Sequence, residues 1–191
     1  MGHGRDRYSP GMSTGRIVFT DSPWPEGHSL ERFRLTLRGD EQGNLRLHAH
    51  IVSAPYESAG SPVGALADAS AWNRPETWLE AQCAILSSLQ WGNRGFKLPS
   101  KTSTFEEHKL DGMVLTADPV KQVSLDNPLE DLAIGAWVLG NGMVGGHRIT
   151  LTRVRPYVFD VHWTGSLRNS FLGEETFDHR FEVNAENVRL S

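Results

Sequence analysis

Two histidines at alternate positions, His48 and His50, have the spacing in this chain best suited to hold a metal ion. Side chains two residues apart on a β-strand point to the same side, so both imidazoles would face one cation. The pattern predicts a divalent-metal site if a third ligand reaches it, with Glu57, His147, His162 and Asp160 as candidates. Such a site would make the chain a metal-dependent or histidine-assisted enzyme with its chemistry at this face.

The segment that carries these histidines, residues 32–52, alternates between apolar and polar residues around a glycine-containing turn. A period of two predicts a pair of antiparallel strands that are buried on one side only. The apolar row, which should lie in the core, is Phe33, Leu35, Leu37, Leu45, Leu47, Ala49 and Ile51. The polar row combines the two histidines with Arg32, Arg34, Arg38 and Arg46.

The four arginines change the chemistry expected at this face. Their positive charge opposes a bound cation and attracts an acidic partner. We therefore expect Arg32, Arg34, Arg38 and Arg46 to bind a partner. The preferred hypothesis is a non-enzymatic binding module that recognises a protein partner or a small ligand of acidic character. The metal enzyme is the alternative.

Motifs of established catalytic chemistry do not occur in the chain. No Gly-x-Ser-x-Gly turn and no paired Cys–His signature is present, and the glycine-rich stretch at 140–146 lacks the Lys-Ser/Thr of a phosphate loop. The paired carboxylates, such as Glu106 with Glu107, fall in polar connections. These observations favour a protein that is not an enzyme and that needs no cofactor, the divalent metal being the alternative.

Composition and charge limit the kinds of partner, and the cellular compartment, that we expect for this chain. The formal charge of −4 gives no overall attraction to phosphate, so nucleic acid is not an expected partner. No apolar run is long enough to span a bilayer, so we expect no membrane contact. The only cysteine, Cys83, cannot form an intrachain disulfide. A cytoplasmic, bacterial-type protein is expected, and its oligomeric state is left open.

The pattern of elements predicts an α+β fold. Asn73, Pro75 and Glu76 resemble a helix start, and apolar residues recur at helical spacing as far as Trp91, which predicts one main helix over about 74–91. The other periodic segments are short and alternating, and they predict a mainly antiparallel, strongly curled sheet of about seven or eight strands, with the helix on one face. Residues 1–14 are expected to be a polar tail and residues 15–191 one globular domain.

Overall fold

The fold was analysed in a computed structural model, which describes residues 14–63 and 70–191. The predicted tail therefore lies outside the described residues except for Thr14, which begins the first strand. The strands are β1 (Thr14–Phe19), β2 (His28–Gly39), β3 (Asn44–Ser53), β4 (Ile85–Ser87), β5 (Phe96–Lys101), β6 (Val114–Ala117), β7 (Gly135–Trp137), β8 (Asn141–Arg155), β9 (Val158–Asn169) and β10 (His179–Arg189). The helix is α1 (Pro75–Ala81), and single 3-10 turns are η1 (Tyr56–Ala59), η2 (Ala71–Asn73), η3 (Thr102–Thr104), η4 (Glu107–Leu110), η5 (Val120–Gln122), η6 (Leu129–Asp131) and η7 (Ser170–Leu172).

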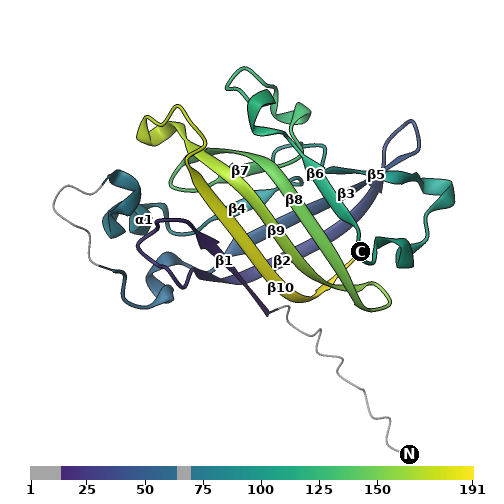
Figure 1. The fold of residues 1–191 in the computed structure, drawn as a ribbon, viewed down its shortest axis with the longest axis horizontal. Helices are drawn as coiled ribbons and strands as arrows, with labels where there is room; N and C mark the ends of the chain where they lie inside the picture. Colours follow the sequence, from purple (N-terminus) through teal and green to yellow (C-terminus); the bar gives the residue numbers. More distant parts are fainter. Residues whose placement is uncertain (1–13, 64–69) are drawn as a thin grey trace, which may run out of the picture.

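The sheet closes on itself to form an antiparallel barrel. Neighbouring strands follow the order β2-β1-β10-β9-β8-β7-β4-β3, and the pairing of β3 with β2 completes the ring. Figure 1 shows β1, β10, β9 and β8 crossing in front of β2 and β3. Two further strands branch from the ring, β5 from β3 and β6 from β8. The expected curled antiparallel sheet is thus present, in the fully closed form that leaves no free edge around the ring.

The interior of the barrel is filled by the inward rows of its strands. In the β2–β3 hairpin, every member of the predicted apolar row is buried except Leu37, which is partly buried against the core. Large side chains from the opposite wall meet this row, among them Trp163, Phe159 and Phe181. The barrel is therefore a packed core in these strands and does not enclose a wide channel.

The predicted helix over 74–91 is wrong in length. The helix ends at Ala81, and the next residue, Gln82, has a positive φ of 66°. Residues 85–87 then form β4, which is one of the strands of the ring. Leu86 belongs to the core as a strand residue, paired with Ile51 of β3. Short apolar runs fit a helix or a buried strand equally well, so periodicity alone does not locate this change.

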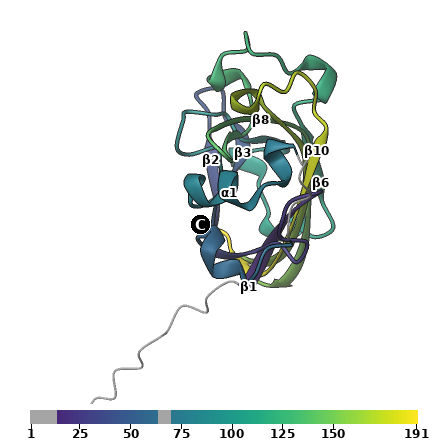
Figure 2. The ribbon, with the colours of Figure 1, turned by 90° about the vertical axis from the view of Figure 1, so that its left-hand side faces the viewer.

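The helix also does not cover a face of the sheet as expected. Viewed from the side in Figure 2, α1 lies across one end of the barrel. Its Trp78 is fully buried among Phe19, Tyr56 and Trp72, with ring centroids 4.8 to 5.3 Å away. The helix therefore acts as an end plug, held in place by aromatic packing.

No helix within residues 14–63 and 70–191 has the length and apolar character required to cross a membrane.

Candidate functional site

The four predicted arginines lie together on the outer side of β2 and β3, which we call the arginine face. Arg34 pairs with His50 across the two strands, and Arg38 pairs with Arg46. Lys97 of β5 is the next partner of Arg46, so that a row of three cations crosses three strands. The chain thus brings the predicted partner-binding residues onto one surface with the predicted metal ligands.

Few acidic groups balance these charges. Arg46 has an ion pair with Asp40, with 3.8 Å between Nε and Oδ2. Within the described ranges, Arg32, Arg34 and Arg38 are exposed and take part in no ion pair. Like charges placed directly opposite each other on a sheet are destabilising.

His48 and His50 are each hydrogen-bonded to a serine at the end of β4. His48 Nδ1 lies 3.2 Å from Ser88 Oγ, and His50 Nδ1 lies 2.9 Å from Ser87 Oγ. Burial lowers the pKa of both imidazoles, and the neighbouring arginines add to this change, although the hydrogen bond with Ser88 acts against it at His48. His48 is buried rather than solvated, because the backbone at Gly95 passes close to its ring and a Cβ there would be 3.1 Å from Nδ1.

A third metal ligand does not join this pair. Among the residues that the structure describes, no group of three or more His, Cys, Asp or Glu side chains is arranged to hold an ion. His162 Nε2 lies 3.0 Å from Glu182 Oε1 on the outside of the barrel, and His179 is stacked on Trp72 with ring centroids 3.7 Å apart. The metal site at His48 and His50 stays a prediction, and the positive charge of the arginine face opposes it.

A buried histidine–aspartate pair forms a second site, which the sequence did not reveal. His147 is buried inside the barrel wall, and its Nε2 lies 3.7 Å from Asp118 Oδ2. The indole N–H of Trp163 donates to His147 Nδ1 at 3.3 Å, so the proton of the neutral ring is on Nε2, the nitrogen nearer Asp118. Nε2 has no hydrogen-bond partner among the described residues.

Two glycines place His147 in the interior. Gly145 pairs with Ser166 and Arg148 pairs with Thr164, so β8 has one residue more than β9 in this stretch. The bulge includes Gly146 at a φ of 62°, and it reverses the alternation so that His147 faces inward. On the neighbouring strand, a Cβ at Gly165 would lie 2.5 Å from Phe181 Cζ and 3.1 Å from His147 Nδ1, so the ring of Phe181 excludes a side chain there and the imidazole approaches the bare backbone.

Asp118 reaches the histidine because it directly follows β6. Ala117 is paired with His147, and the next residue, Asp118, turns away with a φ of 49°, which is unusual for a residue with a side chain. Its carbonyl accepts the Gly146 N–H at 2.5 Å, and its carboxylate accepts the Ala133 N–H at 2.8 Å. The aspartate is therefore held from two sides.

Burial changes the pKa values of His147 and Asp118 in opposite directions. It lowers the pKa of His147 to about 3, and it raises the pKa of Asp118, although two backbone N–H groups and Arg94 act against the latter change. Asp118 also lines a pocket of about 440 Å³, together with Arg94, Gln122 and Asp131. A carboxyl group at a pocket with a buried imidazole behind it has the composition of a proton-transfer site.

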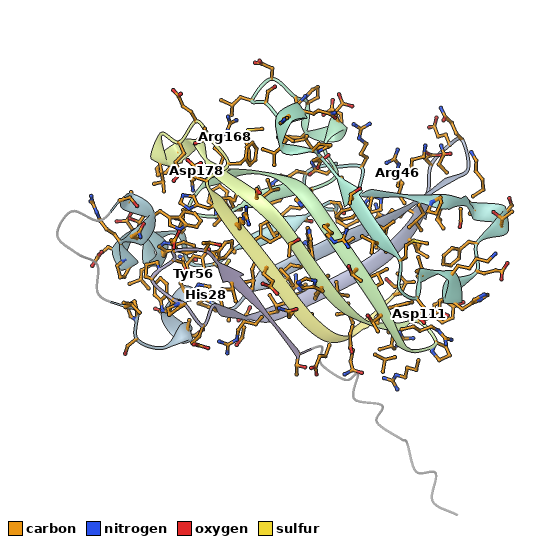
Figure 3. All side chains as sticks on the ribbon, in the orientation of Figure 1. His28, Arg46, Tyr56, Asp111, Arg168 and Asp178 are labelled. Carbon is orange, nitrogen blue, oxygen red and sulfur yellow. The ribbon has the colours of Figure 1, made fainter. Side chains whose placement is uncertain are left out.

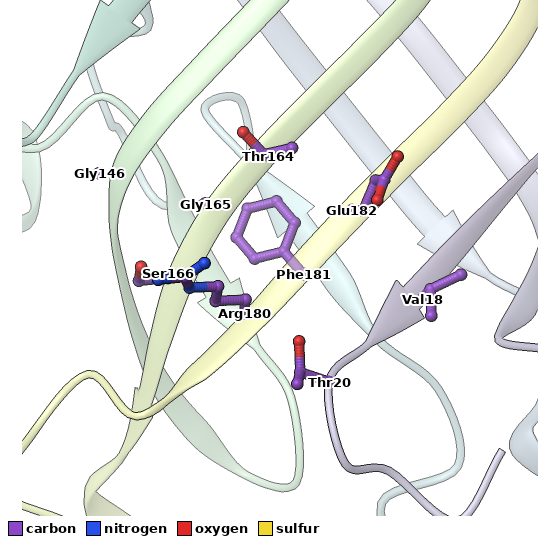
Figure 4. Close-up of a pocket in the computed structure, with 9 residues that line it drawn as sticks. All are labelled: Val18, Thr20, Gly146, Thr164, Gly165, Ser166, Arg180, Phe181 and Glu182. Carbon is purple, nitrogen blue, oxygen red and sulfur yellow. The ribbon is translucent and has the colours of Figure 1, made fainter. Parts of the chain in front are cut away.

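Two more pockets can be described within residues 14–63 and 70–191. One, of about 450 Å³, is a polar depression on the outer side of β8, β9, β10 and β1, bordered by Thr164, Arg180 and Glu182 (Figure 4). The other, of about 280 Å³, is mostly apolar and lies where the 125–136 segment meets the start of β8. The three pockets are separate from the arginine face.

The end plug contains a further polar pair. Figure 3 shows His28 and Tyr56 side by side at the α1 end of the barrel, with ring centroids 4.7 Å apart. Both side chains are fully buried, and neither ring nitrogen of His28 nor the Tyr56 hydroxyl has a hydrogen-bond partner among the described residues. Burial, followed by the charge of Arg16, lowers the pKa of His28 to about 4.

One sequence signal for the missed pair did exist. Two glycines in the middle of an alternating strand, Gly145 and Gly146, are typical of a bulge, and a bulge often redirects the next side chain. The partner Asp118 gave no comparable signal, because its Asp-Pro sequence is also an ordinary turn.

Comparisons of this chain with protein families, with curated proteins and with solved structures gave no match.

Proposed function

We propose that this protein is a binding module whose arginine face docks an acidic segment of a protein partner. The observation that carries the proposal is the row of Arg38, Arg46 and Lys97 across three strands. Sheet surfaces ordinarily alternate charges of opposite sign or neutral residues at such positions, because like charges repel across strands. A sheet surface on which like charges face one another is better explained by a ligand whose negative charge neutralises them.

The basic surface extends beyond the predicted residues. Leu190 forms a parallel bridge with Leu35, which places the preceding exposed residues, Arg189 and Arg34, beside each other on the outside. From Arg32 to Arg38 the face is about 20 Å long, at roughly 3.3 Å per strand residue. An extended acidic segment of six or seven residues has a matching length.

The electrostatic character favours a protein over nucleic acid. The whole chain carries a net charge of −4, so a long polyanion would be repelled outside the arginine face. A short acidic segment needs only the local positive surface. Its association should depend on salt, because exposed charges are screened beyond roughly 10 Å at 0.1 M ionic strength.

The proposal is tested with a fluorescent acidic peptide of about eight residues, alternating Glu and Ser, whose length suits the face. We expect fluorescence anisotropy to report binding at low salt, weakening as salt is added. The double variant Arg34→Glu and Arg38→Glu should weaken binding at least about tenfold, equivalent to about 1.4 kcal/mol.

A matched control separates local from overall charge. Arg148→Glu and Arg155→Glu alter two exposed arginines of β8, outside the arginine face, by the same charge. If this control weakens peptide binding as strongly as the first pair, only net charge matters and the proposal fails. It also fails if single-stranded DNA of equal charge binds more tightly than the peptide.

A further inference from the structure

The polar depression on the outer side of β8, β9, β10 and β1 has the features of a second binding site. Its volume is about 450 Å³, and small-molecule sites commonly have volumes of roughly 300–1,000 Å³. In Figure 1 these strands form the front wall of the barrel, whereas β2 and β3, which carry the arginine face, cross behind them. A ligand in the depression would therefore bind independently of an acidic partner at the arginine face.

Arg180 stands between two hydroxyl groups in this depression. Arg180 of β10 is paired with Ser166 of β9, and on its other side its carbonyl accepts the backbone N–H of Thr20 at 2.9 Å. The three residues therefore lie in one row across neighbouring strands, and Figure 4 shows their side chains around the same part of the depression. A guanidinium group with hydroxyl groups beside it is a set of hydrogen-bond donors suited to a carboxylate.

The charge of Arg180 is not neutralised by a neighbouring side chain. Arg180 is exposed, and within the described ranges it takes part in no ion pair. On the β8 side the depression is bordered by Gly146, which has no side chain to fill the space. The guanidinium group is thus available to a ligand.

Glu182 gives the same depression a negative group. Its Oε1 accepts a hydrogen bond from Asn184 at 3.0 Å and lies 3.0 Å from His162 Nε2, and Asn184 and His162 face each other on the side away from Arg180. The hydrogen bond from Asn184 lowers the pKa of Glu182, burial acts against this change, and the contact with His162 lowers the pKa further. Glu182 is therefore ionised at neutral pH and is held by groups other than Arg180.

The two opposite charges determine the kind of ligand that fits. A simple anion at Arg180 would be repelled by Glu182, and a simple cation at Glu182 would be repelled by Arg180. At roughly 3.3 Å per strand residue, the Cα atoms of these two residues are about 7 Å apart. Two hydrogen bonds of about 2.9 Å each, with a small molecule between them, span a distance of this order.

We propose that this depression binds a small zwitterion, of the kind of an α-amino acid with a short side chain. The carboxylate of the ligand contacts Arg180, Ser166 and Thr20. Its ammonium group contacts Glu182 and the hydroxyl group of Thr164, the residue paired with Glu182 on β9. Charges that are exposed to water interact weakly, so both contacts are needed for binding.

The experiment compares L-alanine with two analogues that each lack one of its charges. L-lactate has a hydroxyl group in place of the ammonium group, and L-alaninamide has an amide in place of the carboxylate. Each compound is titrated into the isotope-labelled full chain at neutral pH, and the amide resonances of residues 18–20, 164–166 and 180–182 are followed by nuclear magnetic resonance. We expect L-alanine to bind about fivefold more tightly than either analogue, the factor that about 1 kcal/mol represents.

Two variants test the two contacts separately. Arg180→Gln should weaken the binding of L-alanine about fivefold. Glu182→Gln keeps an oxygen that accepts from Asn184 but loses the negative charge, so L-lactate should then bind as tightly as L-alanine. Arg155→Gln and Glu186→Gln make the same changes of charge at exposed positions outside the depression and should bind like the unaltered chain.

Three outcomes would overturn the proposal. The first is no binding of L-alanine, and the second is equal affinity for L-alanine and L-lactate in the unaltered chain. The third is a loss of preference in Glu186→Gln as large as that in Glu182→Gln, because overall charge and not the depression would then decide the affinity. The double variant Arg34→Glu and Arg38→Glu should leave L-alanine binding unchanged, since the arginine face is a separate surface.

Discussion

At the scale of single residues, His28 is the side chain whose environment fits it least. Its ring is fully buried among Trp24, Tyr56 and Trp78, and both nitrogens lack a partner among the described residues. Removing an unsatisfied buried polar group in favour of an apolar one of similar shape is commonly neutral or stabilising. The aromatic cage, and not any hydrogen bond of the imidazole, is what stabilises this end of the barrel.

We therefore expect His28→Leu to leave the free energy of unfolding unchanged or to raise it by about 1 kcal/mol. Tyr56→Phe, which removes the neighbouring unpaired hydroxyl, should behave in the same way. Trp78→Ala should by contrast cost about 3–5 kcal/mol, because it empties the centre of the plug. Urea unfolding measures all three. A loss above about 2 kcal/mol for His28→Leu would mean that the imidazole has a partner, such as a buried water.

The residues that the sequence identified well are those whose role depends on near neighbours in the chain. Alternation in the hairpin correctly separated the buried row from the arginine face. The sequence named His147 only as a possible third metal ligand and did not identify Asp118, because the pair acquires its role from groups far away in the sequence. His147, for example, meets Asp118 and Trp163 only after β8 has paired with β6 and β9.

At the scale of elements, the bulge of β8 is the feature on which the His147 site depends. Gly146 has a φ of 62°, and a Cβ there would lie 3.0 Å from Val120 Cγ2. The left-handed conformation costs a residue with a Cβ about 1–2 kcal/mol. Any side chain at this position therefore adds both backbone strain and a steric contact.

Gly146→Ala should lower the free energy of unfolding by about 2 kcal/mol or more. The matched control is Gly173→Ala, at a φ of 78° with no atom within 4 Å of the added Cβ, which should cost only about 1 kcal/mol of strain. Near-ultraviolet circular dichroism should also change for Gly146→Ala, because Trp163 is bonded to His147. Equal losses in the two variants would show that the contact with Val120 is relieved without cost.

Element boundaries were least predictable where the chain changes its type of structure. Apolar residues at helical spacing continued to Trp91, but the positive φ at Gln82 ends the helix and Leu86 enters the barrel as part of β4. Glutamine carries no signal for a left-handed conformation, so tertiary pairing with β3 decides the outcome over local preference. In β5, Pro99 interrupts the alternation, so the pattern of residues does not predict this strand.

At the scale of the whole molecule, closure of the barrel was not predictable from the pattern of strands. The hairpins β2–β3 and β8–β9 are local, whereas the pairings β1–β10 and β4–β7 join distant segments and turn a curled sheet into a ring. Nothing in alternation distinguishes a strand that ends a sheet from one that closes a barrel.

Buried neutral histidines make the stability of the molecule depend on pH. The pKa of His28 is lowered from 6.5 to about 4, and that of His147 from 6.5 to about 3. In both cases the pKa of the histidine is lower in the folded chain than in the unfolded chain. Below about pH 6.5 the unfolded chain therefore binds protons at these histidines that the folded chain does not bind. Their stabilising effect is complete above about pH 6.5 and is lost as the pH falls towards 4.

Free energies of unfolding measured in urea between pH 7.5 and 4.5 should fall by about 1.4 kcal/mol per pH unit for each such histidine, below about pH 6. The pKa of Asp118 is raised by burial, so this carboxyl group acts in the opposite direction. His28→Leu should reduce the change in the free energy of unfolding per pH unit by the contribution of one histidine. A flat profile between pH 6.5 and 4.5 would contradict the neutral state of both histidines.

The branching of β5 from the ring has a consequence for association between molecules. Strands within the closed ring are paired on both sides, whereas β5 pairs only with β3 among the described strands. A free strand edge can serve as a template for pairing with a strand from another copy of the chain. In β5 the edge contains Lys97, Pro99 and Lys101, and its register with β3 is interrupted by a bulge. Charge, a missing N–H and an irregular backbone all obstruct the addition of a strand, so the molecule carries its own protection against edge-to-edge aggregation.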